Sequence, residues 1–159
     1  MRIRIISVGK LKEPFYSAGV KEYVKRLGPY VNLELYEGLE VKTSPKASPE
    51  EIKRCLAKET EQILKLLSEE ELLVVLSLEG QQLDSLQLAG QIQKWQQSNK
   101  NRLNFVVGSA FGLAETLKDK ADFSLSFSPL TFPHQMVVLM LAEQIYRSFK
   151  ILKGEPYHH

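Results

Sequence analysis

The sequence has very little cysteine: Cys55 is the only one among 159 residues. A single thiol excludes an intrachain disulfide and a zinc site built from the thiolates of one chain. Cys55 lies where apolar residues recur at helical spacing, so we expect a half-buried structural thiol rather than a nucleophile. No spacing of histidine, aspartate or glutamate resembles a metal site, and we expect no bound metal.

Long apolar runs are also missing. No segment approaches the ~20 apolar residues that a membrane span requires. The apolar part of the opening Met1–Val8 is too short for a secretory signal and has no cleavage site after it. We therefore expect a cytoplasmic protein that has no membrane partner.

Neither sign of charge dominates, since 21 basic and 19 acidic residues leave a formal charge of +2. A dedicated RNA-binding domain is usually more basic, so the overall charge gives little support to a nucleic-acid partner. The apolar fraction of 43% is ordinary for a globular protein. The length suits one well-buried domain and is short for two, which predicts a single domain over residues 1–159.

Three common catalytic or nucleotide-binding patterns are absent. The chain has no Gly-x-Gly-x-x-Gly fingerprint and no phosphate-binding Gly-x-x-x-x-Gly-Lys-Ser/Thr, so dinucleotide-dependent hydride transfer and P-loop phosphoryl transfer lose support. No serine stands in a nucleophile-elbow pattern, which leaves a catalytic triad without support.

Strand-like and helix-like segments alternate along the chain. Strands are predicted at Arg2–Val8, Val31–Tyr36, Leu72–Leu78, Arg102–Val107 and Phe123–Phe127. Helices are predicted at Glu13–Leu27, Ser48–Leu67, Leu86–Gln97, Leu113–Lys118 and His134–Leu152. Such alternation is typical of an α/β fold, a three-layer α/β/α domain with a mainly parallel sheet. The polar loop 38–47 is the candidate mobile segment.

Two strands near the end of the chain run into loops of small or turn-forming residues. They are Phe105-Val-Val-Gly-Ser-Ala-Phe-Gly112 and Phe123-Ser-Leu-Ser-Phe-Ser-Pro-Leu-Thr-Phe-Pro-His134. Ligands of open α/β proteins bind where strand ends meet such loops. Gly108, having no Cβ, permits a ligand to approach the backbone closely. The pair predicts one cofactor pocket, although two purely structural loops remain the alternative.

The last helix and the tail combine cations with aromatic rings. Arg147, Lys150 and Lys153 lie at helical spacing, and Tyr157 and His158 follow them. This combination is typical of a surface that binds a polyanion. The alternatives are favourable placement of cations at a helix C-terminus and a solvated tail.

Taken together, these segments resemble a known family, the small RlmH-type (YbeA-like) ribosomal RNA large-subunit methyltransferases of the SPOUT superfamily. The resemblance runs from end to end and includes the length. It is carried by eight segments: Ile6–Lys10, Glu22-Tyr23 with Arg26–Tyr30, Leu76–Gly80, Phe105–Gly108 with Gly112, Leu125–Ser128, Leu130–Gln135, Glu143–Arg147 and Gly154–His158.

The resemblance implies a fold whose C-terminal part forms a trefoil knot, which base rates alone would reject. It also implies S-adenosylmethionine as cofactor, N3-methylation of a pseudouridine in 23S rRNA on assembled ribosomes, and a homodimer. The broad apolar run Met136–Ala142 favours a contribution of the helix 134–152 to the dimer interface, with a role in the core alone as the alternative. Two hypotheses from other classes stay open. One is a non-catalytic module that binds RNA or the ribosome, and the other is an α/β enzyme that acts on a free nucleotide.

Carried over by position, the cofactor-binding residues are Leu76, Gly108, Phe127, Ser128, Pro129, Leu130, Thr131 and Phe132. We expect valine at position 108 to fill space reserved for the ligand. The family usually has a second glycine where this chain has Ser109. If the backbone needed a positive φ there, serine would cost roughly 1–2 kcal/mol.

The expected catalytic residues are Arg147, Tyr157 and His158. Arg147 would clamp a phosphate or stabilise the ionised base. His158 would act as general base or orient the base, because histidine titrates near neutrality. Tyr157 would stack on the base.

Overall fold

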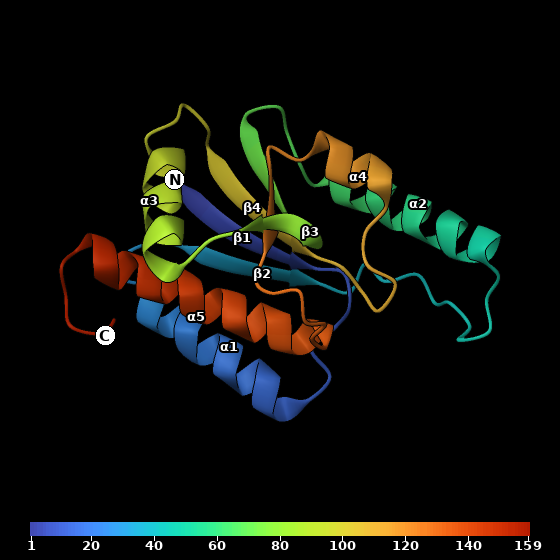
Figure 1. Cartoon of the computed structure of the whole chain (residues 1–159), viewed down its shortest axis with the longest axis horizontal. Helices are drawn as coiled ribbons and strands as arrows, with labels where there is room; N and C mark the ends of the chain where they lie inside the picture. Colours follow the sequence, from blue (N-terminus) through green and yellow to red (C-terminus); the bar gives the residue numbers. More distant parts are fainter.

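A computed structural model describes all 159 residues as five strands and five helices that alternate along the chain (Figure 1). The strands are β1 (Arg2–Ser7), β2 (Leu33–Glu37), β3 (Glu71–Gln82), β4 (Arg102–Val107) and β5 (Phe123–Ser126). The helices are α1 (Pro14–Leu27), α2 (Pro49–Lys65), α3 (Ser85–Gln96), α4 (Glu115–Lys120) and α5 (His134–Leu152). The order is the predicted one. β3 runs on to Gln82 instead of ending at Leu78, and α4 begins at Glu115 rather than Leu113.

The five strands form one sheet in the order β2-β1-β4-β3-β5, and every neighbouring pair is parallel. Parallel strands that are covered on both faces have nearly continuous apolar sequences. The run Leu72–Val75 of β3 is such a sequence, and all four of its residues are buried. The predicted, mainly parallel sheet is therefore confirmed, and it is parallel throughout.

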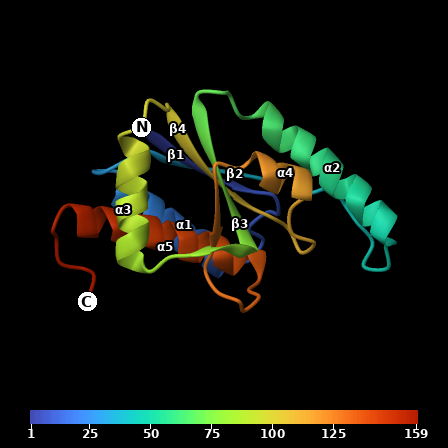
Figure 2. The ribbon, with the colours of Figure 1, turned by 45° about the horizontal axis from the view of Figure 1, so that its top comes forward.

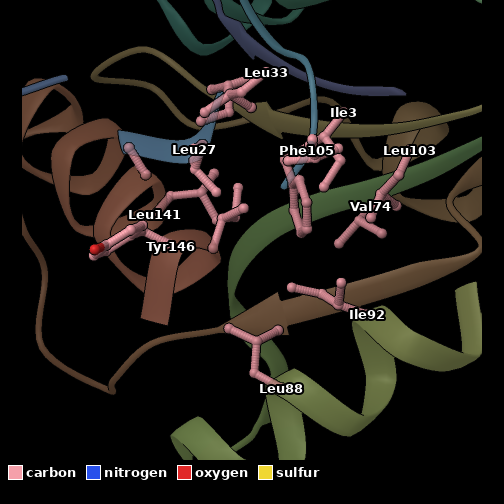
Figure 3. Packing of buried hydrophobic residues seen from close by; sticks show 14 of the residues in the cluster. Ile3, Leu27, Leu33, Val74, Leu88, Ile92, Leu103, Phe105, Leu141 and Tyr146 are labelled. Carbon is pink, nitrogen blue, oxygen red and sulfur yellow. The ribbon is translucent and has the colours of Figure 1, made fainter. Parts of the chain in front are cut away.

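Helices cover both faces of the sheet, which confirms the predicted α/β/α layers (Figures 1 and 2). α1, α3 and α5 cover one face, where Phe105 and Val74 of the strands point towards Leu88 and Ile92 of α3 (Figure 3). α2 and α4 cover the other face, and a smaller apolar cluster fills that layer. α5 lies against both α1 and α3 and is the central helix of its layer.

A buried charge network holds α2 on the sheet. Arg4 of β1 is 7% exposed and donates hydrogen bonds to Asn104 of β4 (2.8 Å), to the Leu66 carbonyl (2.8 Å) and to Glu71 of β3 (3.2 Å). The last carbonyls of a helix have no partner within the helix. Arg4 therefore caps the C-terminal end of α2 while it also hydrogen-bonds to side chains of β4 and β3.

β3 and β5 cross at a contact that only glycine permits. Their pairing shifts register between Leu76 and Gln81, so part of β3 bulges away from β5 and returns. Gly80 lies within this bulge. A Cβ on Gly80 would stand 2.7 Å from the Leu125 carbonyl carbon and 2.8 Å from the carbonyl carbon of Ser124. The two backbones touch here, and the contact sets where β5 ends and its following loop begins.

The crossing predicts opposite effects for two glycine substitutions. Gly80→Ala should destabilise the protein by about 1–3 kcal/mol, because the new methyl group overlaps backbone that cannot move aside. Gly90→Ala is the matched control: its added Cβ meets no atom within 4 Å. Within α3 that alanine should stabilise by about 0.5–1 kcal/mol. Urea unfolding at one fixed protein concentration measures both, and equal stabilities of the two variants would contradict the crossing.

Candidate functional site

A cavity of about 840 Å³ lies at the carboxyl ends of β3, β4 and β5. Its walls are residues 76–79, the loop 107–113 with Lys118 of α4, and residues 125–128, 130–134 and 137. The carboxyl edge of an open parallel sheet is the usual ligand position in α/β proteins. The volume lies within the range of small-molecule pockets.

Most of the predicted cofactor-binding residues line this cavity. Those that line it are Leu76, Gly108, Phe127, Ser128, Leu130, Thr131 and Phe132. Pro129 belongs to the same loop but is not part of the wall. Segments separated by more than 30 positions in sequence thus meet in one place.

Several wall residues escaped the sequence analysis. Glu79 directly follows the predicted strand Leu72–Leu78, and its place at a strand end was an available signal. Lys118 offered no such signal, because only the packing of α4 beside the β4 loop brings it to the cavity. His134 also lines the cavity, and its Nε2 lies 3.4 Å from the Lys10 carbonyl oxygen.

The loop after β4, residues 108–112, is called the glycine loop here because glycines stand at both of its ends. It closes on its own backbone. A Cβ on Gly108 would stand 2.6 Å from the Gly112 carbonyl oxygen, and the Gly112 N–H donates to the Ser109 carbonyl (2.9 Å). Gly112 has φ +76°, a conformation that favours glycine. The expectation that a side chain at position 108 would fill ligand space is therefore corrected: it would first collide with Gly112 and open the loop.

Ser109 carries no backbone strain. No residue other than glycine has a positive φ, so the possible cost considered for serine at this position does not arise. Ser109 is buried and pairs with Gly112 in a short antiparallel bridge. Serine thus serves this loop as well as a second glycine would.

The second loop is held by its own hydroxyl groups. Ser126 donates to the Ser128 carbonyl (3.2 Å), and the Leu130 N–H donates to the Ser128 hydroxyl (3.0 Å). Such local side-chain bonds replace the regular ladder or helix bonds that the prolines prevent. Leu130, at the tip, is 67% exposed, so within one chain this large apolar side chain has little cover.

One lysine and one glutamate, Lys118 and Glu79, line the cavity. The Lys118 ammonium lies 3.4 Å from Glu79 and 3.1 Å from Glu115, which is outside the wall. Burial lowers the pKa of Lys118, but the hydrogen bond with Glu115 and the charge of Glu79 outweigh it and the net shift is upward. A hydrogen bond from Ser77 holds the pKa of Glu79 below its usual value. Both groups are therefore ionised.

The three predicted catalytic residues gather around one carboxylate. Arg147 and Tyr157 both donate to Glu143 (3.0 and 3.1 Å), and Arg147 Nη1 lies 3.3 Å from His158 Nδ1. The Arg147 guanidinium also lies 4.8 Å above the Tyr157 ring. The hydrogen bond to Glu143 raises the pKa of Arg147, and burial raises that of Tyr157. Glu143 had no role in the sequence analysis, yet it joins this tail cluster.

The tail cluster and the cavity lie at opposite ends of α5. The cavity reaches Val137 in the first turns of the helix, whereas Arg147 lies ten residues further on. At 1.5 Å per residue that distance is about 15 Å. Figures 1 and 2 show the chain end far from the loop that follows β5. One chain alone does not bring the predicted catalytic residues to the predicted cofactor-binding residues.

No three side chains among histidine, cysteine, aspartate and glutamate are grouped so that they could hold a metal ion. None of the helices combines the length and the apolar character needed to cross a bilayer.

Known proteins are similar to this chain over its whole length. A protein from Syntrophomonas wolfei, called ribosomal RNA large subunit methyltransferase H, is 56% identical and the match covers 99% of both chains. Proteins of the same name from Acetivibrio thermocellus and Halothermothrix orenii are 44% and 42% identical with equal coverage.

The solved structure of a probable methylase family protein from Haemophilus influenzae superimposes with a TM-score of 0.54 and 17% identity, covering 99% of this chain and 70% of that one. That likeness concerns the fold alone. The family model described as "Predicted SPOUT methyltransferase" matches residues 1–158. With the full-length relatives, this match shows that the chain belongs to the SPOUT methyltransferase family.

Proposed function

We propose that this protein methylates N3 of a pseudouridine in 23S rRNA on assembled ribosomes, with S-adenosylmethionine as methyl donor. Family membership and the full-length relatives support the reaction class. The observation that carries the proposal is the cavity of about 840 Å³ that two backbone loops form at the carboxyl edge of the sheet. Ribosomes place the reaction in the cytoplasm.

The residues present fit this cofactor. Leu76, Phe127 and Phe132 supply apolar surface for a purine, and the loop 127–132 supplies backbone groups that can recognise its polar edge. Gly108 closes the opposite wall. When bound, the cofactor supplies a methyl group on a sulfonium, which is already a strong electrophile. The protein must then position the base and exclude water.

The separation of cavity and tail cluster supports a homodimer. A second copy can bring its tail to this chain's cavity, which one chain cannot do for itself. α5 links the two regions, and the exposed Leu130 offers apolar surface beside the cavity. Two copies also double the surface available to a ribosome. We propose that each active site combines the cavity of one protomer with the tail of its partner.

The tail cluster has the groups that N3-methylation needs. N3 of the base must lose a proton, and Arg147 can stabilise the negative charge that develops. We propose that His158, whose ring lies beside that guanidinium, accepts the proton. The raised pKa of Tyr157 keeps its phenol protonated, so Tyr157 can stack or donate a hydrogen bond but does not act as the base.

The trefoil knot remains a prediction of the resemblance. In such a knot one segment of the chain passes through a loop of another, and this passage would place the loop 127–132 beside the glycine loop.

Cofactor binding gives the first test. The protein should bind S-adenosylhomocysteine in a calorimetric titration, and Gly108→Ala should weaken binding at least tenfold by opening the glycine loop. Ser109→Gly is the matched control and should bind normally, since there is no strain to relieve. Normal binding of S-adenosylhomocysteine by Gly108→Ala would show that the glycine loop is not part of the cofactor site. A wild-type protein that binds no cofactor would favour the non-catalytic module.

Turnover on ribosomes gives the second test. Arg147→Ala and deletion of residues 157–159 should each lower single-turnover methyl transfer at least tenfold, or about 1.4 kcal/mol in barrier. Cofactor affinity should change little, because the tail cluster is remote from the cavity within a chain. Normal turnover after the deletion would show that the tail is passive.

Mixed dimers test the shared active site. Chains with Arg147→Ala lack a working tail, and chains with Gly108→Ala lack a working cavity. If each site takes one part from each protomer, mixing the two inactive proteins creates some intact sites and restores part of the turnover. Mixtures that stay as inactive as their components would show that each site is built by a single chain.

A further inference from the structure

The cavity wall is almost free of formal charge. Of the residues that line it, Lys118 is the only lysine or arginine and Glu79 the only aspartate or glutamate. His134 is the one other titratable group. Its ring is packed against Gly9, where an added Cβ would stand 2.5 Å from His134 Nε2, and that nitrogen is directed at the Lys10 carbonyl. Lys118 is therefore the one cation on the wall that an anionic group of a ligand can meet.

The Lys118 side chain is largely covered, whereas the side chains of its two partners are exposed. Its side chain is 20% exposed, and the neighbouring Leu117 is completely buried, which anchors α4 on the sheet. The side chains of Glu79 and Glu115 are 78% and 79% exposed. Ion pairs with such exposed partners contribute little to stability. Another carboxylate can therefore replace either glutamate at small cost, without moving the ammonium group.

We infer that Lys118 binds the carboxylate at the amino-acid end of the cofactor. The inference deepens the proposed function and rests on it. The adenosine part of S-adenosylmethionine can be recognised by apolar side chains and backbone groups, which the loop 127–132 provides. A carboxylate that leaves water needs a cation or strong donors. Lys118 meets that need and directs the amino-acid end of the ligand towards α4.

Two ligands separate this role from a structural one. S-adenosylhomocysteine carries the amino-acid group, and 5′-methylthioadenosine keeps the adenosine and the sulfur but lacks that group. In calorimetric titrations, Lys118→Gln should lower the affinity for S-adenosylhomocysteine at least tenfold and leave the affinity for methylthioadenosine unchanged. Lys120→Gln, on the same helix but outside the cavity wall, is the control and should change neither. Lys118→Arg keeps the positive charge and should keep most of the preference for S-adenosylhomocysteine over methylthioadenosine.

Each result decides the matter. If Lys118→Gln lowers the affinity for both ligands equally, Lys118 only supports the shape of the cavity. If it lowers neither affinity, the carboxylate binds elsewhere. Either outcome overturns the inference. If Lys118→Gln does not fold, the wild type still decides, because failure to prefer S-adenosylhomocysteine over methylthioadenosine also overturns it. A wild-type protein that binds neither ligand would contradict the proposed function itself. This outcome is distinct from the ones that overturn only the role of Lys118.

Discussion

The contact between two backbones at Gly80 and Leu125 is the constraint on which the ligand-sized cavity depends. Because Gly80 has no side chain, β3 can bulge past Leu76 and still rest on β5. The register of β5 then determines where the next loop emerges. Directly after the neighbouring strand β4, Gly108 permits a second backbone contact, with Gly112. Two glycines, used for close packing of the chain on itself, shape the cavity more than any side chain that points into it.

α5 separates two kinds of chemistry. Its first turns close the cavity, and its last turns carry Arg147 with the tail cluster around Glu143. A helix is rigid over this length, so the two ends cannot approach each other within one chain. The separation makes the oligomeric state part of the proposed mechanism rather than an independent property. It also explains why the cofactor and catalytic roles can be tested in different variants.

The distribution of charge matters more than its sum. The small net charge conceals a buried cluster around Arg4 and Glu71, which serves the fold. It also conceals the tail cluster, in which Glu143 accepts hydrogen bonds from Arg147 and Tyr157 and the imidazole of His158 lies beside Arg147. The cavity, by contrast, has a single ion pair on its wall. A ligand there meets mostly neutral surface, so one ammonium group can set its orientation.

The order of strands and helices was determined by the sequence itself. Apolar periodicity distinguishes strand from helix, and runs such as Leu72–Val75 show that both faces of the sheet are covered. The pocket residues followed from two loops at strand ends and from the resemblance. These signals are local, which is why a single sequence contains them.

Tertiary structure alone decided the rest. The reason for glycine at position 108 depends on Gly112, whose backbone lies against it only after the loop has closed. Lys118 reaches the cavity because α4 packs beside that loop, and no pattern along the chain marks it. The distance between the cavity and Arg147 likewise depends on the direction of α5 across the sheet. Contacts between segments remote in sequence carry no periodic signal, so only the folded chain reveals them.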